Sequence, residues 1–277
     1  MARRAQKRIP NALTIAGLDP SGGAGLLADV KAMSANGAYA CGVLTAVTMQ
    51  NTRGVFGVTA LSGQDISAQM DRLFEDVRID AVKIGMLGNA EIIQAVAAGL
   101  QRWRPAFVVL DPVMVGKSGD RLLEEAAVSA LVQELLPLAT VITPNLPEAA
   151  DLLGEEEART KIEMQRQAAK LHALMGPQGW VLLKGGHLEG DAADDWLEGA
   201  DFGGWLPGRR VATKNTHGTG CTLSSALAAL LPQCSSVPEA CREAKAYIAG
   251  AIAHADDLDV GSGHGPTNHF WALWPSN

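Results

Sequence analysis

The length, composition and charge of the chain limit the classes of protein to which it can belong. With 277 residues, 47% of them hydrophobic, it has enough apolar side chains to bury the core of one large α/β domain. Its formal net charge of −7 at pH 7 excludes the basic surface that nucleic-acid binding requires, and favours small molecules as partners. No stretch approaches the roughly 18 consecutive apolar residues of a membrane span, so no membrane partner is expected.

The cysteines and the first residues favour a cytoplasmic protein. The four cysteines form no CxxC pair, which is typical of reduced thiols in the cytoplasm. Residues 3–8 are mostly basic, and no apolar signal-peptide core follows them. We therefore expect a solvated basic tail over residues 1–10 and a single domain over residues 11–277, since no linker or internal repeat divides the sequence.

Apolar runs alternate with helical patterns along most of the chain. Because strands that alternate with helices pair in parallel through right-handed crossovers, this order predicts a three-layer α/β fold with a central, mostly parallel sheet flanked by helices. Uniformly apolar strands agree with burial on both faces. In chain order we predict strand 12–17, helix 23–36, strand 43–49, helix 65–76, strand 81–85, helix 90–103, strand 107–111, helix 122–136, strand 140–143, helices 147–153 and 161–175, and strand 180–184.

The pattern changes after residue 184. Two short segments, 193–198 and 211–214, are separated by turns rich in Gly and Pro, which indicates antiparallel edge strands. Helices over 221–231 and 238–257 then close the chain.

Residues 214–221, Lys-Asn-Thr-His-Gly-Thr-Gly-Cys, join a glycine-rich turn to the start of a helix. Gly218 and Gly220 allow the backbone to approach a ligand, and the amides of Thr219, Gly220 and Cys221 belong to the first turn, which cannot satisfy them internally. The helix dipole also favours negative charge there, so the segment predicts a phosphate-type anion site. The same field should lower the pKa of the Cys221 thiol. A glycine loop that only turns the chain is the alternative.

Polar segments follow six of the predicted strands. Ligands of open parallel sheets bind beyond the carboxyl ends of the strands, so polar residues at six such ends predict one shared ligand site. Taken singly, each segment could be turn chemistry. The six segments are 17–25, 50–54, 83–87, 111–114, 143–148 and 184–187.

Two segments resemble motifs of other enzyme classes but lack features that those motifs require. Residues 116–118, Gly-Lys-Ser, resemble the end of a phosphate-binding P-loop, but its earlier glycine would fall at Asp111. The alternating glycines of residues 261–266 lie near the C-terminus, with a proline where a helix should open, which excludes a dinucleotide fingerprint and an NAD-dependent enzyme. His264 and His269 leave a metal site open, although no second cluster has zinc-like spacing.

Taken together, these motifs resemble those of the hydroxymethylpyrimidine/phosphomethylpyrimidine kinases of thiamin biosynthesis, a branch of the ribokinase-like superfamily. The resemblance covers the chain from about residue 11 onward and implies a ribokinase-like fold and a homodimer. It also implies ATP as phosphoryl donor with Mg²⁺, and an aminopyrimidine alcohol that is phosphorylated to the monophosphate and then to the diphosphate. The segments that carry it are 12–25, 50–55, 143–148 and 214–221.

The resemblance also implies roles for individual residues. Asp29 and Gln50 are expected to hydrogen-bond the aminopyrimidine, which a carboxylate and a carboxamide can do. Cys221 is expected to take the proton of the substrate hydroxyl, while amides at the start of the helix stabilise the transferred phosphoryl group. The remaining roles are pocket lining for Gly17, Met86 and Val113, phosphoryl stabilisation for Gly218, Thr219 and Gly220, ATP binding for Lys184, Asn145 and Thr216, and positions near Mg²⁺ for Asp111 and Glu148.

Other interpretations stay open at this point. Cysteine at the end of the anion motif, where many ribokinase-like kinases have aspartate, also occurs in related pyridoxal kinases, so a vitamin B6 kinase is the closest competing enzyme. A non-catalytic binder that senses the pyrimidine is another. Asp111 and Glu148 could be helix caps or ion-pair partners, Asp29 a helix residue at solvent, and Gln50 a loop cap. Residues 52–62 and 116–120 are candidate lids over the substrate.

Overall fold

The structure is a computed structural model that describes residues 8–115 and 122–274. Within these residues nine strands form one sheet in the order β3-β2-β1-β4-β5-β6-β7-β8-β9. Neighbours from β2 to β7 run parallel, whereas β3, β8 and β9 pair antiparallel at the two edges. The strands are β1 (Asn11–Leu18), β2 (Tyr39–Asn51), β3 (Gly54–Ala60), β4 (Ala81–Ile84), β5 (Phe107–Leu110), β6 (Val141–Ile142), β7 (Trp180–Leu183), β8 (Asp195–Gly199) and β9 (Phe202–Leu206).

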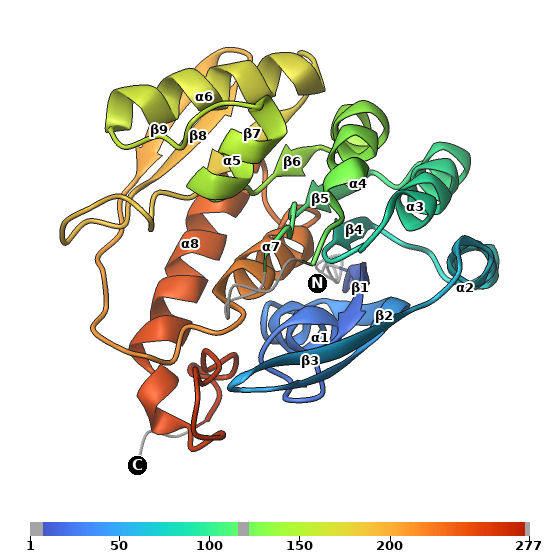
Figure 1. Cartoon of the computed structure of the whole chain (residues 1–277), viewed down its shortest axis with the longest axis horizontal. Helices are drawn as coiled ribbons and strands as arrows, with labels where there is room; N and C mark the ends of the chain where they lie inside the picture. Colours follow the sequence, from blue (N-terminus) through green and yellow to red (C-terminus); the bar gives the residue numbers. More distant parts are fainter. Residues whose placement is uncertain (1–7, 116–121, 275–277) are drawn as a thin grey trace, which may run out of the picture.

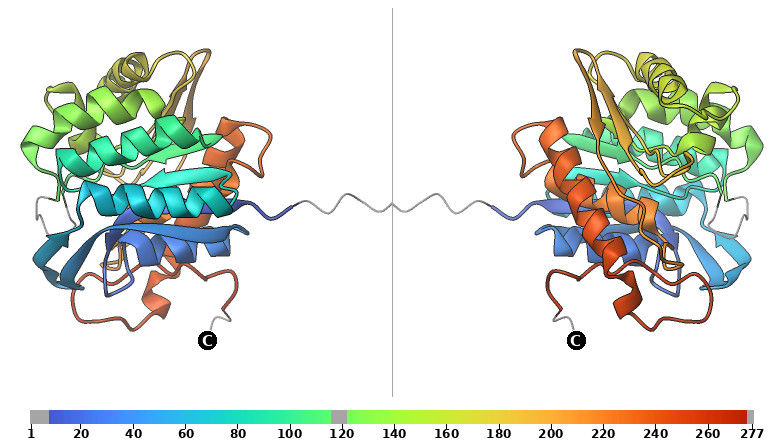
Figure 2. Two further views of the ribbon diagram at one scale, coloured as in Figure 1. Left: turned by 90° about the vertical axis from the view of Figure 1, so that its right-hand side faces the viewer. Right: turned by 90° about the vertical axis from the view of Figure 1, so that its left-hand side faces the viewer.

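Helices cover both faces of the sheet, as Figures 1 and 2 show. One apolar core lies between the sheet and α2 to α6, and a second lies between the sheet and α1, α7 and α8. This confirms the predicted three-layer α/β fold. The helices are α1 (Gly25–Ala35), α2 (Gly63–Asp76), α3 (Ala90–Trp103), α4 (Glu125–Ala130), α5 (Leu146–Leu153), α6 (Lys161–Met175), α7 (Thr219–Leu230) and α8 (Val237–Ala253), and Ala255–Asp257 add a 3₁₀ turn.

Alternation along the central strands explains why the two cores form. Val108 and Leu110 of β5 belong to the first core, whereas Val109 between them belongs to the second. Successive side chains of a strand point to opposite faces, so a strand that is apolar throughout must have helices on both sides. Lys83 interrupts this pattern, because it is a fully buried lysine in the middle layer.

Two element predictions were wrong. Residues 211–214 form no strand, and Thr213 there hydrogen-bonds Asp256. The second edge strand is β9, which pairs with β8 as a hairpin in which the rings of Trp196 and Trp205 meet edge to face at 4.9 Å. The helix predicted over 122–136 is broken, because α4 continues as a π-helical turn at Leu131–Leu135 and a 3₁₀ turn at Leu136–Leu138 that contains a proline.

Only one of the two segments expected as candidate lids lies within the described residues. The segment 52–62, expected as a candidate lid, contains β3, which pairs with β2. The other candidate, 116–120, lies outside the described residues, as do residues 1–7 of the expected basic tail. Pro10 is already buried and its carbonyl accepts a hydrogen bond from the Tyr39 amide, so the ordered fold begins before β1.

A glycine-rich strap, residues 261–268, crosses two segments that are far away in the sequence. The Gly263 amide donates to the Thr52 hydroxyl at 3.1 Å, and the Gly265 amide donates to the Asn215 side chain at 3.1 Å. A Cβ atom at Gly263 would lie 2.1 Å from the Thr52 carbonyl oxygen, and one at Gly265 would lie 2.3 Å from the side-chain oxygen of Asn215. The alternating glycines therefore permit close backbone approach between the strap, the β2–β3 turn and the 214–221 segment.

Candidate active site

Two loops meet at the carboxyl ends of the central strands, the one between β1 and α1 and the one before α7. Gly218 caps the N-terminus of α7 with φ +74°, a left-handed conformation that favours glycine. A Cβ atom there would lie 1.8 Å from the Gly23 carbonyl oxygen. Gly218 is therefore required twice, once for its backbone angle and once for the contact between the loops.

The start of α7 presents backbone amides, as the sequence predicts. In the part of the chain that the structure describes, we find no acceptor for the amides of Gly220 and Cys221. The amide of Thr219 is directed to the Thr216 carbonyl at 3.4 Å, and the Thr219 hydroxyl donates to the same oxygen at 2.8 Å. Two amides are thus available to an anion, whereas Thr216 holds the turn through its carbonyl.

Cys221 lies where the first turns of two helices meet. Its Sγ accepts a hydrogen bond from the backbone amide of Gly25, the first residue of α1. Burial raises the pKa of the thiol to about 11, and the nearby Lys83 ammonium and the Gly25 amide only partly oppose this effect. In the protein without ligand, loss of solvation therefore moves the pKa in the direction opposite to the expected effect of the helix field.

Lys184 follows β7 and joins two carboxyl groups at the same edge. Its Nζ lies 3.2 Å from Oδ1 of Asp111 and 3.8 Å from Oε2 of Glu148. Burial alone would lower the pKa of Lys184, but the two carboxylates outweigh it and raise the pKa. A Cβ atom at Gly220 would lie 3.2 Å from Nζ of Lys184, so the ammonium borders the amides of α7.

Asp111 is held by two hydroxyl groups as well. Thr143 donates to its Oδ1 at 3.1 Å, and Ser224 of α7 donates to its Oδ2 at 3.2 Å. The carboxylate is almost fully buried. Asp111 is therefore fixed between the ends of β5 and β6 and the first turns of α7.

Glu148 has a structural role as a helix cap. In a capping box at the start of α5, the Asn145 side chain accepts from the Glu148 amide, and the Glu148 carboxylate accepts from the Asn145 amide, both at 2.8 Å. Burial, with the neighbouring Asp111, raises the pKa of Glu148 to about 7 against the pull of Lys184. Asn145 and Glu148 are thus placed by the cap beside Lys184, and their contacts with ATP and Mg²⁺ stay predictions.

The chemistry of this cluster fits a magnesium ion bound with phosphates. Mg²⁺ prefers oxygen ligands, and it is usually held by one or two carboxylates together with substrate phosphates and water. Asp111 and Glu148 supply two buried carboxyl groups. Residues 8–115 and 122–274 contain no group of three or more His, Cys, Asp or Glu that could hold a metal alone. His264 and His269 hydrogen-bond separate partners, Lys214 and Thr222.

On the other side of the site, Gln50 lies at the end of β2. Its Oε1 accepts from the Thr48 hydroxyl at 3.0 Å, and its Nε2 lies 3.4 Å from Nε2 of His217. His217 in turn contacts Oδ2 of Asp19 at 2.7 Å. Burial would raise the pKa of Asp19, but hydrogen bonds from His217 and Ser21 outweigh it and lower the pKa. Gln50 therefore lies beside the loop before α7, which His217 joins to the loop between β1 and α1 through Asp19.

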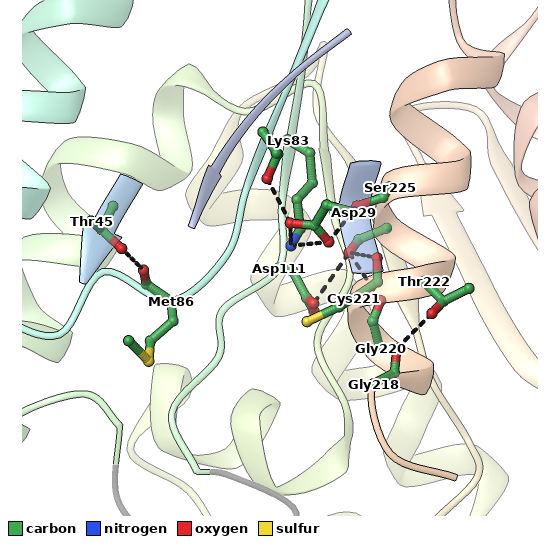
Figure 3. Close-up of polar contacts among 12 residues, drawn as sticks. Asp29, Thr45, Lys83, Met86, Asp111, Gly218, Gly220, Cys221, Thr222 and Ser225 are labelled. Atoms are coloured by element: carbon green, nitrogen blue, oxygen red, sulfur yellow. Dashed lines mark hydrogen bonds and ion pairs between the residues drawn. The ribbon is translucent and has the colours of Figure 1, made fainter. Parts of the chain in front are cut away.

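Gly17 and Met86, both expected to line the pocket, lie against each other. A Cβ atom at Gly17 would lie 2.6 Å from Cε of Met86, and the Met86 carbonyl accepts from the Thr45 hydroxyl at 2.7 Å (Figure 3). Val113 is half-buried, two residues beyond Asp111 after β5. The structure thus brings Gly17 and Met86 together, and the contact of all three residues with a substrate stays a prediction.

Asp29 is not a residue at solvent, which was the alternative to its expected contact with the substrate. Its side chain is fully buried, and its two oxygens contact Lys83, the Thr14 hydroxyl and the Ser225 hydroxyl (Figure 3). Every one of these partners is internal. A direct contact with a substrate therefore stays a prediction, and it would require one of these partners to give way.

Two groups of residues were missed by sequence reasoning. Lys83 was included only as part of the polar segment 83–87 and was given no role, although a lone lysine in an apolar strand is a signal of a buried partner. His217 and Asp19 were included only as loop residues, although each lies beside glycines in a predicted ligand loop. The Lys83–Asp29 pair and the His217–Asp19 pair each join segments far apart in the chain, and the periodicity of a sequence does not reveal such contacts.

Solved structures with the same fold are kinases of the ribokinase-like type. The ADP complex of Bacillus subtilis pyridoxal kinase superposes with a TM-score of 0.87 and 36% identity, over 96% of this chain and 99% of that chain. Phosphomethylpyrimidine kinase from Clostridium difficile superposes with a TM-score of 0.77 and 41% identity, over 88% and 99%. The fold of this chain is ribokinase-like.

Sequence comparison gives the family. The family model described as phosphomethylpyrimidine kinase matches residues 19–268. The hydroxymethylpyrimidine/phosphomethylpyrimidine kinase of Escherichia coli (strain K12) is 53% identical over 97% of this chain and 100% of its own length. This chain belongs to the phosphomethylpyrimidine kinase family.

Proposed function

We propose that this protein is an ATP-dependent kinase of thiamin biosynthesis. It phosphorylates 4-amino-5-hydroxymethyl-2-methylpyrimidine and then the resulting monophosphate to the diphosphate. The observation that carries the proposal is the position of Lys184, which lies between Asp111 and Glu148 and borders the free amides of α7. This arrangement fits a phosphoryl group in transfer, and full-length relatives named for both kinase activities agree with it.

The donor side of the site supplies charge and alignment. Phosphoryl transfer requires little covalent chemistry from the protein, but it requires alignment and compensation of the charge on the transferred group. Lys184 and the amides of Gly220 and Cys221 offset that charge, and Asn145 and Thr216 border the nucleotide. Asp111 and Glu148 would hold Mg²⁺, which supplies further positive charge beside the phosphates when bound.

Cys221 accepts the proton of the substrate hydroxyl as the oxygen attacks phosphorus. The proton moves to the thiolate Sγ and the O–H bond breaks as the new O–P bond forms, while the bond between the γ-phosphorus and the bridging oxygen breaks and ADP leaves. Because the buried thiol is protonated at neutral pH in the protein alone, this role requires positive charge in the site to favour the thiolate. Gly218 to Gly220 shape the backbone that receives the equatorial oxygens.

Gln50 reads the aminopyrimidine on the acceptor side, between Gly17, Met86 and Val113. Its carboxamide offers an acceptor and a donor to the exocyclic amine and a ring nitrogen, and Thr48 and His217 limit its rotation. A site whose polar groups are paired by one ring rejects analogues that leave them unpaired.

One assay tests the proposal. We expect ADP release from ATP only when the hydroxymethylpyrimidine is added, and mass spectrometry should then detect both the monophosphate and the diphosphate. ADP release at background level with the pyrimidine would favour a binder without activity. If added monophosphate is inert, the second phosphorylation is absent.

A second candidate is pyridoxal phosphorylation. The observation in its favour is the close match to solved pyridoxal kinases, including the Staphylococcus aureus enzyme in complex with pyridoxal, with a TM-score of 0.86 and 31% identity over 96% of this chain and 95% of that chain. The same ADP assay with pyridoxal in place of the pyrimidine separates the two. A larger kcat/KM for pyridoxal would reverse the assignment.

We further propose that the protein is a cytoplasmic homodimer. The edge strand β3 exposes Phe56 to 71%, and its neighbour β2 exposes Met49 to 50%. An unpaired strand edge with apolar side chains favours association with a second copy. Light scattering after gel filtration tests this, since Phe56→Asp should give a monomer. No helix among the described residues is long and apolar enough to cross a membrane.

A further inference from the structure

Lys83 is a buried lysine that has no part in the proposed reaction. It lies in β4, its partner Asp29 lies in α1, and both side chains are fully buried. The ammonium donates to the two Asp29 oxygens at 2.9 and 2.8 Å (Figure 3). Buried ion pairs seldom add net stability, because the cost of desolvating both charges offsets their attraction. The pair therefore calls for an explanation other than stability.

The Asp29 carboxylate connects four elements around the loop that precedes α7. The Thr14 hydroxyl of β1 donates to its Oδ2 at 2.6 Å, and the Ser225 hydroxyl of α7 donates to its Oδ1 at 2.7 Å. With Lys83 from β4 and Asp29 itself from α1, two strands and two helices share one carboxylate. A shift of any of these elements would leave a buried charged or hydroxyl group unpaired, which costs free energy.

The same two helices meet again one turn away, at the thiol. Gly25 and Asp29 are four residues apart on α1, and Cys221 and Ser225 are four residues apart on α7, so each pair lies on one face of its helix. The Gly25 amide donates to Sγ of Cys221, and Ser225 donates to Asp29. These two contacts fix the position of the thiol relative to the buried ion pair.

Charges from four elements face the thiol. Lys83 of β4 stabilises a negative charge on Cys221, whereas Asp29 of α1 and Asp111 after β5 oppose it. Lys184, after β7, also interacts with a charged Cys221. Lys83 and Asp29, which form an ion pair with each other, thus have opposite effects on a negative charge at Cys221.

We propose that Lys83 is a positioning residue, which through Asp29 holds α1 against α7 and presents a buried positive charge to the Cys221 thiol. The proposal rests on the proposed function only in placing Cys221 at the site of phosphoryl transfer. Removing the ammonium would leave an unbalanced carboxylate near the thiol, and removing the carboxylate would leave an unbalanced ammonium. The two changes should therefore have opposite effects on thiolate formation.

The test is the rate at which iodoacetamide alkylates Cys221, measured between pH 7 and 10 by mass spectrometry of the peptide that contains it. Only the thiolate reacts, so a pKa change of one unit changes the rate about tenfold below the pKa. Relative to the unmodified protein, we expect alkylation to be about tenfold slower in Lys83→Met, about tenfold faster in Asp29→Asn, and within about twofold in the double variant. The proposal would be overturned if the two single variants changed the alkylation rate in the same direction, or if one of them changed it by less than about twofold.

Lys83→Met leaves a buried carboxylate without a partner, which destabilises the fold. A second comparison therefore decides the test if this variant does not fold. Circular dichroism and Tm report folding. If the variant is not recovered folded, Asp29→Asn and the double variant decide, because they differ only in the ammonium. The double variant must then react more slowly than Asp29→Asn, and equal rates would overturn the proposal.

The chain contains a matched control. Lys245 and Asp195 form another ion pair, with Nζ 2.6 Å from Oδ2 and with Asp195 buried and Lys245 partly exposed, and neither is among the groups that face Cys221. Replacing both, as Lys245→Met with Asp195→Asn, should leave the alkylation rate of Cys221 within about twofold. A change as large as that of the Lys83 variants would mean a general loss of packing and would overturn the proposal. Alkylation needs no phosphoryl transfer, so failure of the kinase assay is a separate result.

Discussion

The backbone amide of Gly25 donates a hydrogen bond to Sγ of Cys221, which joins the first turn of α1 to the first turn of α7. Gly25 adopts φ +56°, and a Cβ atom there would lie 2.3 Å from the Gly17 carbonyl oxygen, so no larger residue could present its amide in this way. Two helix N-termini thus point at one thiol. Loss of solvation still outweighs the effect of the Gly25 amide and raises the pKa of the thiol to about 11, and this balance makes Cys221 the first residue to test.

Replacing Cys221 by Ala should lower kcat strongly and leave the affinity for ATP nearly unchanged. A base typically contributes about 10²–10⁴-fold in rate, and Cys221→Asp should recover part of the loss, because it restores a group that can accept a proton. Steady-state kinetics over pH 6 to 10 measure this. If Cys221→Ala keeps most of kcat with the same pH profile, catalysis comes from positioning and the backbone amides alone.

Gln50→Ala should impair use of the aminopyrimidine more than use of pyridoxal. Loss of a buried hydrogen bond to the exocyclic amine costs ~1–3 kcal/mol, or roughly 5- to 150-fold in kcat/KM, and pyridoxal has no such amine. The measurement is kcat/KM of the unmodified protein and the variant with both substrates. Equal losses for the two would mean that Gln50 only holds the end of β2.

Glu148 should make stability depend on pH. Its pKa is raised from 4.5 to about 7 in the folded protein, so the folded state binds the proton more tightly than the unfolded state. This contribution is fully present below about pH 4.5 and is lost as the pH rises to about 7, with a slope of at most about 1.4 kcal/mol per pH unit. Urea unfolding at several pH values should show this fall relative to Glu148→Gln, which keeps the cap but does not titrate. Parallel curves for the two proteins would contradict the raised pKa.

Gly263→Ala should weaken binding of the pyrimidine. The added Cβ atom would lie 2.1 Å from the Thr52 carbonyl oxygen, so the strap must move away from the turn that follows Gln50. We expect a roughly tenfold rise in KM for the pyrimidine with little change in KM for ATP, since small displacements of positioning groups are costly. Gly54→Ala is the matched control in the same hairpin, because no described atom lies within 4 Å of its added Cβ. Equal behaviour of the two variants would exclude a role of the strap in substrate binding.

Much of the fold follows from local patterns. The strand at 107–110 was predicted because it is apolar on both faces, which only a covered parallel sheet explains. The last edge strand of the sheet was harder to predict, since residues 211–214 and 202–206 are both short and bounded by turns. Only the pairing of Trp196 with Trp205 across the hairpin distinguishes the true strand, and a pair is not visible in one segment.

The candidate site was predicted as a set of loops, and its internal connections were not. Lys184 and Asp111 follow strands, so their meeting could be expected from the order of the sheet. Lys83 and Asp29 are 54 residues apart, and Asp19 and His217 are 198 apart, on elements whose facing sides depend on how helices pack. The desolvation that raises the pKa of Cys221 likewise depends on that packing, and a local motif does not reveal it.

The strap also affects when the protein becomes active during its synthesis. Gly263 holds Thr52, which lies 211 residues earlier in the chain, so the hairpin that carries Gln50 leaves the ribosome long before the segment that anchors it. Closing so long a loop comes late in folding, because its entropy must be lost before the contacts form. Nascent chains stalled before residue 261 would therefore contain all nine strands but an unanchored acceptor hairpin.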